Sequence, residues 1–456
     1  MNINQKTKQT QHHSIQSYVN KTDAYSFFNL LTSPQLLDVI EEQLPNHRER
    51  LYPPTTTLSL FMAQAMNSDA SCQNTVDRHV VERVFNGLPV CSTMTGAYCK
   101  ARQRLPTEMI SELVKQTGQR VAKRNPEHWQ WQGRPVKLVD GTTITMPDTV
   151  ENQTRYPQQS EQKTGLGFPI SRMVAIICLS SGMILNAAMG KYKGKGGSEQ
   201  ALFRQLLDTF EAGDIVLADR YYTSYFLIAM LIDKGVDIIF QQHATRKTDF
   251  RKGQQLGTRD HIARWKKPKK RPEWMSKQGY DAFPNELCIR EFKAGKKILV
   301  TTLLSDKHAS KKELASLNKQ RWHVELDLRN IKTTLGMENL SCKTPAMNEK
   351  EMWVYFLAYN LIRLVMAEAA LYSQLMPRQL SFKHTLQIWL IWSKQFSPND
   401  DHIDTLLIMI AQIRVGNRPG RIEPRAIKRR PKAYSLLMKP RANARADIKK
   451  YGHPKV

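Results

Sequence analysis

Cysteine is scarce in this sequence, and the cysteines present fall into no metal-binding pattern. The 456 residues include six cysteines, and no two of them form a CxxC pair. Their spacing matches neither a zinc ribbon nor a zinc finger, and they are too sparse for a disulfide framework in a chain of this length. We therefore expect a reduced, cytoplasmic setting.

A long apolar run is also missing. The first twenty residues are polar and rich in Gln and Asn, and they lack the apolar core of a signal peptide. The longest apolar stretch, residues 173–189, is interrupted by serine, glycine and asparagine, so two strands around a turn explain it better than a membrane span. We expect a soluble protein with no membrane partner.

Acidic residues are outnumbered. Lysine and arginine total 68 against 41 aspartates and glutamates, which gives a formal net charge of +27. Such a charge destabilises a fold through self-repulsion, so a polyanionic partner explains it best. Nucleic acid is the first candidate, an anionic membrane surface the second, and a generically basic soluble protein the third. The lack of a membrane span favours nucleic acid.

Composition and periodicity divide the chain into a polar tail, a helical region, an α/β domain and a basic helical C-terminal region: residues 1–20, 21–129, 130–345 and 346–456. The hydrophobic fraction of 41% is enough for real cores. Helical spacing of apolar residues recurs from 27 to 40, from 72 to 85 and from 109 to 122. A further apolar helix is expected at 352–371.

The α/β domain is predicted from short apolar runs that alternate with helical ones. The expected strands are 136–139, 173–179, 183–188, 214–218, 238–240 and 298–304. Residues 225–232 predict a helix, and the basic, irregular stretch of about 241–297 predicts an insertion. Two of the strands are followed directly by an aspartate, Asp140 and Asp219. For either residue alone, a turn or helix-cap role is the better explanation.

Residues 311–335 predict one long helix, because Leu317, Val324, Leu328, Ile331 and Leu335 form a stripe at 3.6 residues per turn. Beside that stripe, Arg321, Glu325 and Lys332 fall within a narrow arc. Charge pairs of this kind are usually solvated surface support. Glu325 combined with the two aspartates is more specific, since three convergent carboxylates can hold two Mg²⁺ ions for an in-line phosphoryl displacement.

Three ordered motifs make the sequence resemble the IS4-type insertion-sequence transposases. The motifs are Leu138-Val139-Asp140-Gly141-Thr142-Thr143 with Met146-Pro147-Asp148-Thr149, then Asp214-Ile215-Val216-Leu217-Ala218-Asp219-Arg220-Tyr221-Tyr222, then Arg321-x3-Glu325-x6-Lys332. The basic segment 417–425 also resembles the C-terminal region of that family. In one departure, Asn318 occupies the position of the family's tyrosine, which removes a phenol and a stacking ring.

The resemblance implies an RNase H-like catalytic core with a strand-rich insertion, flanked by helical N-terminal and C-terminal regions. It implies that Asp140, Asp219 and Glu325 are catalytic and bind Mg²⁺, with Mn²⁺ substituting for it. It further implies that Arg321 and Lys332 contact DNA phosphates, which suits the bidentate arginine fork and the lysine point charge.

A tryptophan from the insertion stacks on a flipped base in related enzymes, so the resemblance makes Trp265 and Trp274 candidate DNA-binding residues. Base extrusion followed by aromatic stacking is physically reasonable. A packing role explains either tryptophan at least equally well.

The resemblance implies a cut-and-paste transposase whose partners are double-stranded DNA, as terminal inverted repeats and target, and a second copy of the chain in an active homodimer. The helical region 21–129 would bind the repeats, and the C-terminal region would aid DNA binding or dimerisation. Two alternatives remain open: an RNase H-like nuclease without strand transfer, and a non-catalytic regulator derived from a transposase. Metal-dependent cleavage and strand transfer separate the three.

Overall fold

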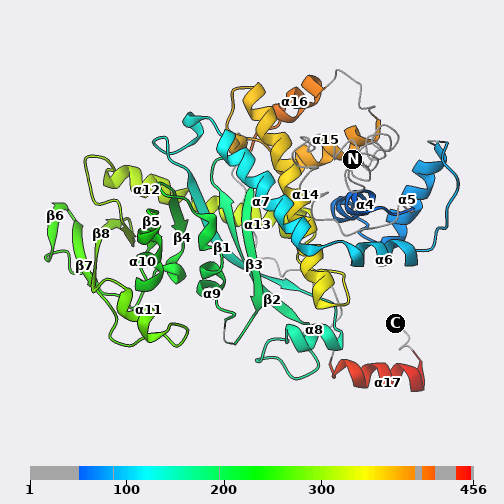
Figure 1. Ribbon diagram of the computed structural model, residues 1–456, viewed down its shortest axis with the longest axis horizontal. Coiled ribbons are helices and arrows are strands. Elements are labelled where there is room, and N and C mark those ends of the chain that lie inside the picture. The colour runs from blue at the N-terminus through cyan, green and yellow to red at the C-terminus, as the bar shows by residue number, and fades with distance from the viewer. Residues whose placement is uncertain (1–50, 86, 195, 396–402, 416–437, 453–456) are drawn as a thin grey trace, which may run out of the picture.

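The computed structural model describes residues 51–85, 87–194, 196–395, 403–415 and 438–452. The expected tail at 1–20, the helical spacing at 27–40 and the basic segment 417–425 lie outside the described residues. Figure 1 shows a central sheet with the strand-rich insertion at one end of the molecule and helices α4, α5 and α6 at the other. The domain boundaries stay predictions.

One mixed sheet of nine strands runs through the described chain in the order β3-β2-β1-β4-β5-β9-β8-β7-β6. β1 pairs antiparallel with β2, and β2 pairs antiparallel with β3. β4 and β5 lie parallel to β1 on its other side. The bounds of these strands are β1 Val136–Thr145, β2 Ile170–Cys178, β3 Ile184–Lys191, β4 Ile215–Ala218 and β5 Asp237–Gln241.

The strand predictions for this part of the chain are confirmed, including the pair of strands at 173–188. Their connection turns at Gly182, whose φ of 79° lies in the left-handed region that glycine adopts without steric cost. The strands are apolar on both sides because helices cover both faces of the sheet, as in other α/β proteins.

The basic sequence suggested that the insertion is irregular, whereas the family resemblance implied a strand-rich insertion. The insertion does form antiparallel strands. β9 pairs antiparallel with β5 and so joins the insertion to the edge of the central sheet. β8, β7 and β6 then follow outward in antiparallel order. The bounds are β6 Gln254–Gly257, β7 Asp260–Lys266, α11 Lys277–Ala282, β8 Glu286–Ala294 and β9 Lys297–Thr301.

Two hydrophobic cores lie on the two faces of the sheet. On one face, Leu138 and Leu217 pack with α7, α12, α13 and α14; on the other, Val139 and Ala218 pack with α9 and α10. This division follows from the alternation of side chains along a strand. The bounds are α7 Thr107–Arg124, α9 Glu199–Arg204, α10 Tyr225–Asp233, α12 Lys311–Lys319, α13 Trp322–Arg329 and α14 Pro345–Tyr372.

In the described part of the chain, α14 is the one helix long and apolar enough to cross a membrane. Of its most apolar window, 83% is buried inside the protein. It packs against α7, α4, α15 and α16, as the central helix of a core does. The remaining helices are α4 Pro54–Met66, α5 Cys72–Phe85, α6 Gly96–Arg104, α8 Val150–Arg155, α15 Phe382–Gln395, α16 Ile403–Gln412 and α17 Arg441–Tyr451.

The single helix predicted over 311–335 is wrong in one respect, because the segment divides into α12, α13 and a π-helical turn over Asn330–Thr334. Between α12 and α13 the backbone tightens: the Arg321 N–H donates to the Asn318 carbonyl at 3.1 Å, and the Val324 N–H donates to the Arg321 carbonyl at 3.0 Å. Such i→i+3 bonds interrupt the regular α-helical pattern. The break places Arg321 directly before α13.

Candidate active site

Asp140 and Asp219 meet where β1 continues past the end of β4. The two parallel strands are in register from Val136 beside Ile215 to Leu138 beside Leu217, and β4 ends at Ala218. Two residues further along both strands, Asp140 and Asp219 stand side by side at an open notch. Asp219 follows its strand as predicted. Asp140, however, lies in the middle of β1 and not at its end, since β1 continues to Thr145 in pairing with β2.

Each aspartate is held by a backbone group. The Gly141 N–H donates to Asp140 Oδ1 at 2.9 Å. The Tyr221 N–H donates to Asp219 Oδ1 at 2.7 Å, at the start of the short 3₁₀ helix Arg220–Tyr222. Both carboxylates are therefore oriented before any ligand binds.

The α13 face brings Glu325 and Arg321 to Asp140. Arg321 Nη2 donates to Glu325 Oε1 at 2.8 Å, while its Nη1 lies 3.9 Å from Asp140 Oδ2. One guanidinium thus stands between two of the predicted carboxylates. Lys332 reaches the same strand, with Nζ donating to Thr142 Oγ1 at 3.3 Å. The break before α13 has not separated the predicted charged residues.

Burial is the main influence on Asp140. Burial, with a smaller contribution from the nearby Asp219 and Glu199, raises the pKa of that carboxyl to about 7 against the opposing effects of the Gly141 N–H and Arg321. Only 19% of the side chain is exposed. A buried carboxylate with other acids around it is unstable as an anion unless a cation joins it.

Three further residues lie at the site: Glu199 and Arg172 stand outside the motifs, and Tyr222 ends the second motif but was not predicted as a site residue. Glu199 from α9 lies against Gly141 and has Arg172 Nε 3.8 Å from its Oε1. Tyr222 is fully buried beside the carboxylates. An acid in the first turn of a helix and a basic residue in a strand are too common in sequences to predict a site, so only the fold reveals them.

The donor set suits a hard divalent cation, because carboxylate oxygens are the protein ligands that Mg²⁺ prefers. Within the described residues, no three acidic, histidine or cysteine side chains are close enough together to hold one ion. The Arg321 guanidinium occupies the space between Glu325 and Asp140. The oxygen ligands therefore fit the metal, and their closure on an ion requires Arg321 to leave that space.

The structure places both candidate tryptophans in the insertion. Trp265 is 2% exposed, its Nε1 donates to Glu291 Oε1 at 2.6 Å, and the Arg246 guanidinium lies 3.6 Å from its ring centre. Its ring cannot meet a base unless Arg246 and its surroundings move, and its contacts are those of a packing residue.

Trp274 is the more accessible of the two candidates, with 46% of the residue exposed. The Arg204 guanidinium lies 3.8 Å from its ring centre. Arg204 is the last residue of α9, the helix that carries Glu199. Trp274 therefore stands next to a helix of the site, whereas Trp265 is enclosed within the insertion.

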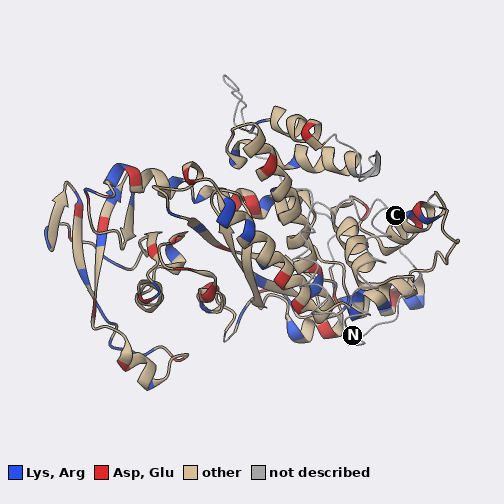
Figure 2. Cartoon of the chain, turned by 45° about the horizontal axis from the view of Figure 1, so that its top comes forward, with Lys and Arg blue, Asp and Glu red and all other residues tan. Residues whose placement is uncertain are grey.

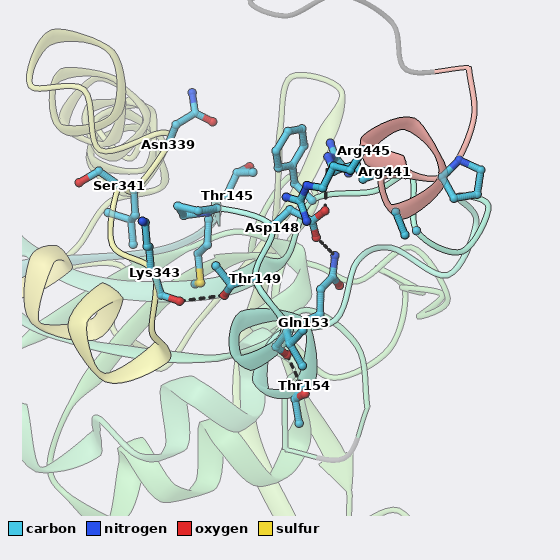
Figure 3. Close-up of a pocket in the computed structure, with 18 residues that line it drawn as sticks. Thr145, Asp148, Thr149, Gln153, Thr154, Asn339, Ser341, Lys343, Arg441 and Arg445 are labelled. Carbon is cyan, nitrogen blue, oxygen red and sulfur yellow. Dashed lines mark hydrogen bonds and ion pairs between the residues drawn. The ribbon is translucent and has the colours of Figure 1, made fainter. Parts of the chain in front are cut away.

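A groove of about 1490 Å³, lined by both polar and apolar residues, begins where β1 ends (Figure 3). Thr145, at the end of β1, lies five residues beyond Asp140, or about 17 Å along an extended strand. The opposite wall is the basic helix α17, fixed by Arg441, whose Nε lies 3.4 Å from Asp148 Oδ2. Labelled residues around the groove include Asn339, Ser341, Lys343 and Arg445.

Comparison with known proteins gives consistent matches. The family model described as the transposase DDE domain matches residues 131–361, half of the chain. The chain is 29% identical over 362 residues to the transposase InsG for insertion sequence element IS4 of Escherichia coli (strain K12), covering 75% of this chain and 78% of that protein. It is 31% identical over 141 residues to the putative transposase InsZ of the same organism, covering 30% of this chain and 46% of that protein. The chain therefore belongs to the IS4-type DDE transposases, and its mixed sheet with flanking helices is the RNase H-like core of that family.

Proposed function

We propose that this transposase binds the terminal inverted repeats of its own insertion sequence, cuts the DNA backbone at their ends and joins the freed 3′-hydroxyls to target DNA. Asp140, Asp219 and Glu325 are its metal ligands. The observation that supports the proposal is their placement: carboxylates that follow or belong to two strands and one helix lie around the notch at the end of β4, with Arg321 between Glu325 and Asp140. Paired ends need one site each, so the active form is at least a homodimer.

Divalent ions, Mg²⁺ or Mn²⁺, would activate the attacking oxygen and stabilise the leaving one. The protein's own residues orient the DNA. Arg321, which pairs with Glu325 and faces Asp140, would exchange these carboxylates for a phosphate next to the cut, because guanidinium binds phosphate bidentately. Lys332, held beside Asp140 by Thr142, would supply a point charge to the same backbone.

Basic residues occur along the whole length of the described chain, as Figure 2 shows. We assign the DNA backbone that leaves the active site to the groove beyond Thr145. Ser341 and Asn339 offer polar atoms to phosphate oxygens there, and the exposed Lys343 and Arg445 add positive charge. Asp148 does not oppose this, because Arg441 pairs with it.

The direct test uses purified full-length protein, DNA carrying the element's ends and a target plasmid. Asp140→Ala, Asp219→Ala and Glu325→Ala should each abolish cleavage in Mg²⁺ or Mn²⁺ while leaving end binding largely intact, since affinity comes chiefly from basic contacts. Full cleavage in EDTA would defeat the metal mechanism. Cleavage without strand transfer would favour the nuclease, and end binding without cleavage would favour the regulator.

The groove has a test of its own. Replacing Lys343 and Arg445 together with alanine should weaken DNA binding across all sequences and reduce the slope of log affinity against log salt by about two, or about one per phosphate contact. Lys449→Ala with Lys450→Ala removes the same charge from α17 outside the groove lining. An equal loss in this control pair would show a general charge effect and no groove.

A further inference from the structure

We propose that Glu199 is a fourth carboxylate ligand of the catalytic centre, reaching the divalent ions from the α9 face, and that Tyr222 positions it. The inference rests on the proposed metal-dependent function and goes beyond it, because Glu199 belongs to none of the motifs that define the predicted triad. It would place ligands on both faces of the sheet.

Contact with Gly141 is the first observation. A Cβ added to Gly141 would stand only 2.6 Å from Glu199 Cδ, so the Glu199 side chain would have to shift. Gly141 is not among the residues with positive φ, so its backbone does not require glycine. The glycine instead leaves room for the Glu199 carboxylate in its present position. Gly141 directly follows Asp140, so the Glu199 side chain lies against β1 next to the first aspartate.

The notch explains how residues from opposite faces can share one centre. Along β1, Leu138 contributes to the α13-side core and Val139 to the α9-side core, so alternation puts Asp140 toward α13 and Gly141 toward α9. Beyond Ala218 no strand fills the position of β4. Glu199 and Glu325 can therefore approach the two aspartates from either side of the sheet.

Tyr222 is the second, independent observation. It is fully buried, and its hydroxyl makes no hydrogen bond of good geometry among the described residues. It nevertheless lies close enough to Glu199 for a side-chain hydrogen bond to affect the pKa of both groups. Its ring packs edge-on against Phe203 of α9, with centroids 5.4 Å apart. Burial raises the pKa of Tyr222 well above its usual range, and Glu199, Asp140 and Asp219 add to this, so the phenol keeps its proton and can donate to a carboxylate that turns toward an ion.

A purely structural role for Glu199 is the alternative. Its ion pair with Arg172 has a separation of 3.8 Å and the glutamate side chain is 29% exposed, and a long, partly exposed pair of this kind contributes little to stability. Arg172 is also engaged elsewhere, since Nη1 donates to the Gly197 carbonyl at 3.1 Å. This weak pair explains neither the missing side chain at position 141 nor the burial of the Tyr222 phenol beside the Glu199 carboxylate.

The test measures Mn²⁺ binding to the full-length protein without DNA, by electron paramagnetic resonance of the free ion. Glu199→Gln should weaken binding by about 10–100-fold, the range found for groups that support a metal site. Glu211→Gln is the matched control, because this exposed glutamate forms an ion pair with the exposed Lys123, at 3.4 Å, and should bind as wild type. Wild-type Mn²⁺ affinity in Glu199→Gln overturns the inference.

Asp140→Asn, measured in the same Mn²⁺ titration, distinguishes a failure of this inference from a failure of the proposed metal-dependent function. If Asp140→Asn loses Mn²⁺ and Glu199→Gln does not, the triad is a metal site and Glu199 is no part of it. If neither variant changes Mn²⁺ binding, the proposed metal centre itself is wrong. Melting temperatures measured without metal show whether each variant is folded.

Gly141→Ala and Tyr222→Phe test the two contacts. Gly141→Ala should reproduce the Mn²⁺ defect by displacing Glu199, with little added loss when combined with Glu199→Gln, because coupled residues are not additive. Tyr222→Phe removes only the hydroxyl and should weaken binding by about 10-fold in the wild-type background and not in Glu199→Gln. Additive losses in either double variant would contradict positioning through Glu199.

Discussion

On each face of the sheet, a glutamate beside the notch pairs with an arginine, but the two pairs differ in their separation. On the α13 face, Arg321 donates to Glu325 at 2.8 Å and also approaches Asp140. On the α9 face, Arg172 stands 3.8 Å from Glu199. Each face pairs an acid with an arginine, but only Arg321 lies between carboxylates of the site. Acidic charge is thus balanced on both sides, and the Arg321–Glu325 pair would have to open for Glu325 and Asp140 to hold a divalent ion together.

Glu325→Gln should have the largest effect of the changes that compare the faces. It removes one negative oxygen ligand and retains the shape of the side chain, so cleavage should fall to background while the melting temperature stays near that of wild type. Measured beside Glu199→Gln, it shows whether the α13 face dominates catalysis. Cleavage by Glu325→Gln at a substantial fraction of the wild-type rate would remove that face from the metal site.

The two arginines come next. Arg321→Ala should lower cleavage about 100-fold at saturating metal, since misplacing a reacting phosphate by about 1 Å has that effect. Lys332→Ala should behave alike. Arg172→Ala should lower cleavage by only about 10-fold, as a residue that orients a ligand and not the substrate.

Cleavage rates and melting temperatures of these three variants decide between positioning and structure. A structural Arg321–Glu325 pair is worth only about 0.2–0.5 kcal/mol and would leave turnover nearly unchanged. Rates within a few-fold of wild type for Arg321→Ala would therefore end its phosphate-positioning role. Equal losses of cleavage rate in Arg321→Ala and Arg172→Ala would mean that the two arginines, on opposite faces of the sheet, do not differ in their importance for cleavage.

A pH-dependent change in stability should follow from Asp140. Its pKa of about 7 in the folded protein lies above the ordinary 3.8, so the stabilisation linked to the bound proton is full below 3.8 and is lost as pH rises through about 7. Asp140→Asn cannot ionise. Without metal, the variant should therefore melt above wild type by a larger margin at about pH 8 than at about pH 5.

Calorimetry at both pH values, with and without Mg²⁺, checks this expectation. Mg²⁺ should narrow the margin at the higher pH, because a bound ion stabilises the wild-type carboxylate alone. If the difference in melting temperature between Asp140→Asn and wild type does not change with pH, the ionisation of Asp140 is not what destabilises the folded protein.

The smallest effect is expected at Asn318, where the family has a tyrosine. Asn318 lies in α12, one turn before α13, and its amide nitrogen has no hydrogen-bond partner among the described residues. Asn318→Ala should leave cleavage within a few-fold of wild type and change stability little, since no hydrogen bond from that nitrogen is lost. A sharp drop in cleavage with normal metal binding would show that the amide contacts DNA.

Much of the fold could be predicted from local sequence. The paired strands at 173–188, the helix at 72–85 and the buried helix around 352–371 follow from side-chain periodicity, which is set by backbone geometry and needs no long-range information. The spacing from Arg321 to Glu325 predicted their contact, since both residues lie on the same side of the break in the helix and one helical turn separates them.

Other features could not be predicted because they depend on residues distant in the sequence. Glu199 meets Gly141 only after β1 and α9 pack together, and Tyr222 is enclosed only when that face of the sheet is covered. The burial of Trp265 likewise depends on Arg246 and Glu291 from other parts of the insertion.

The sequence by itself determined the order of the strands along the chain, the three ordered motifs and the excess of positive charge, because composition and short-range spacing carry them. Only the tertiary structure decided that β4 ends one residue before the level of Asp140 along β1, and so opened the sheet there. The physical reason is that register between strands is set by packing of whole faces. That register places Asp140 and Asp219 side by side, with Glu325 on one face of the sheet and Glu199 on the other.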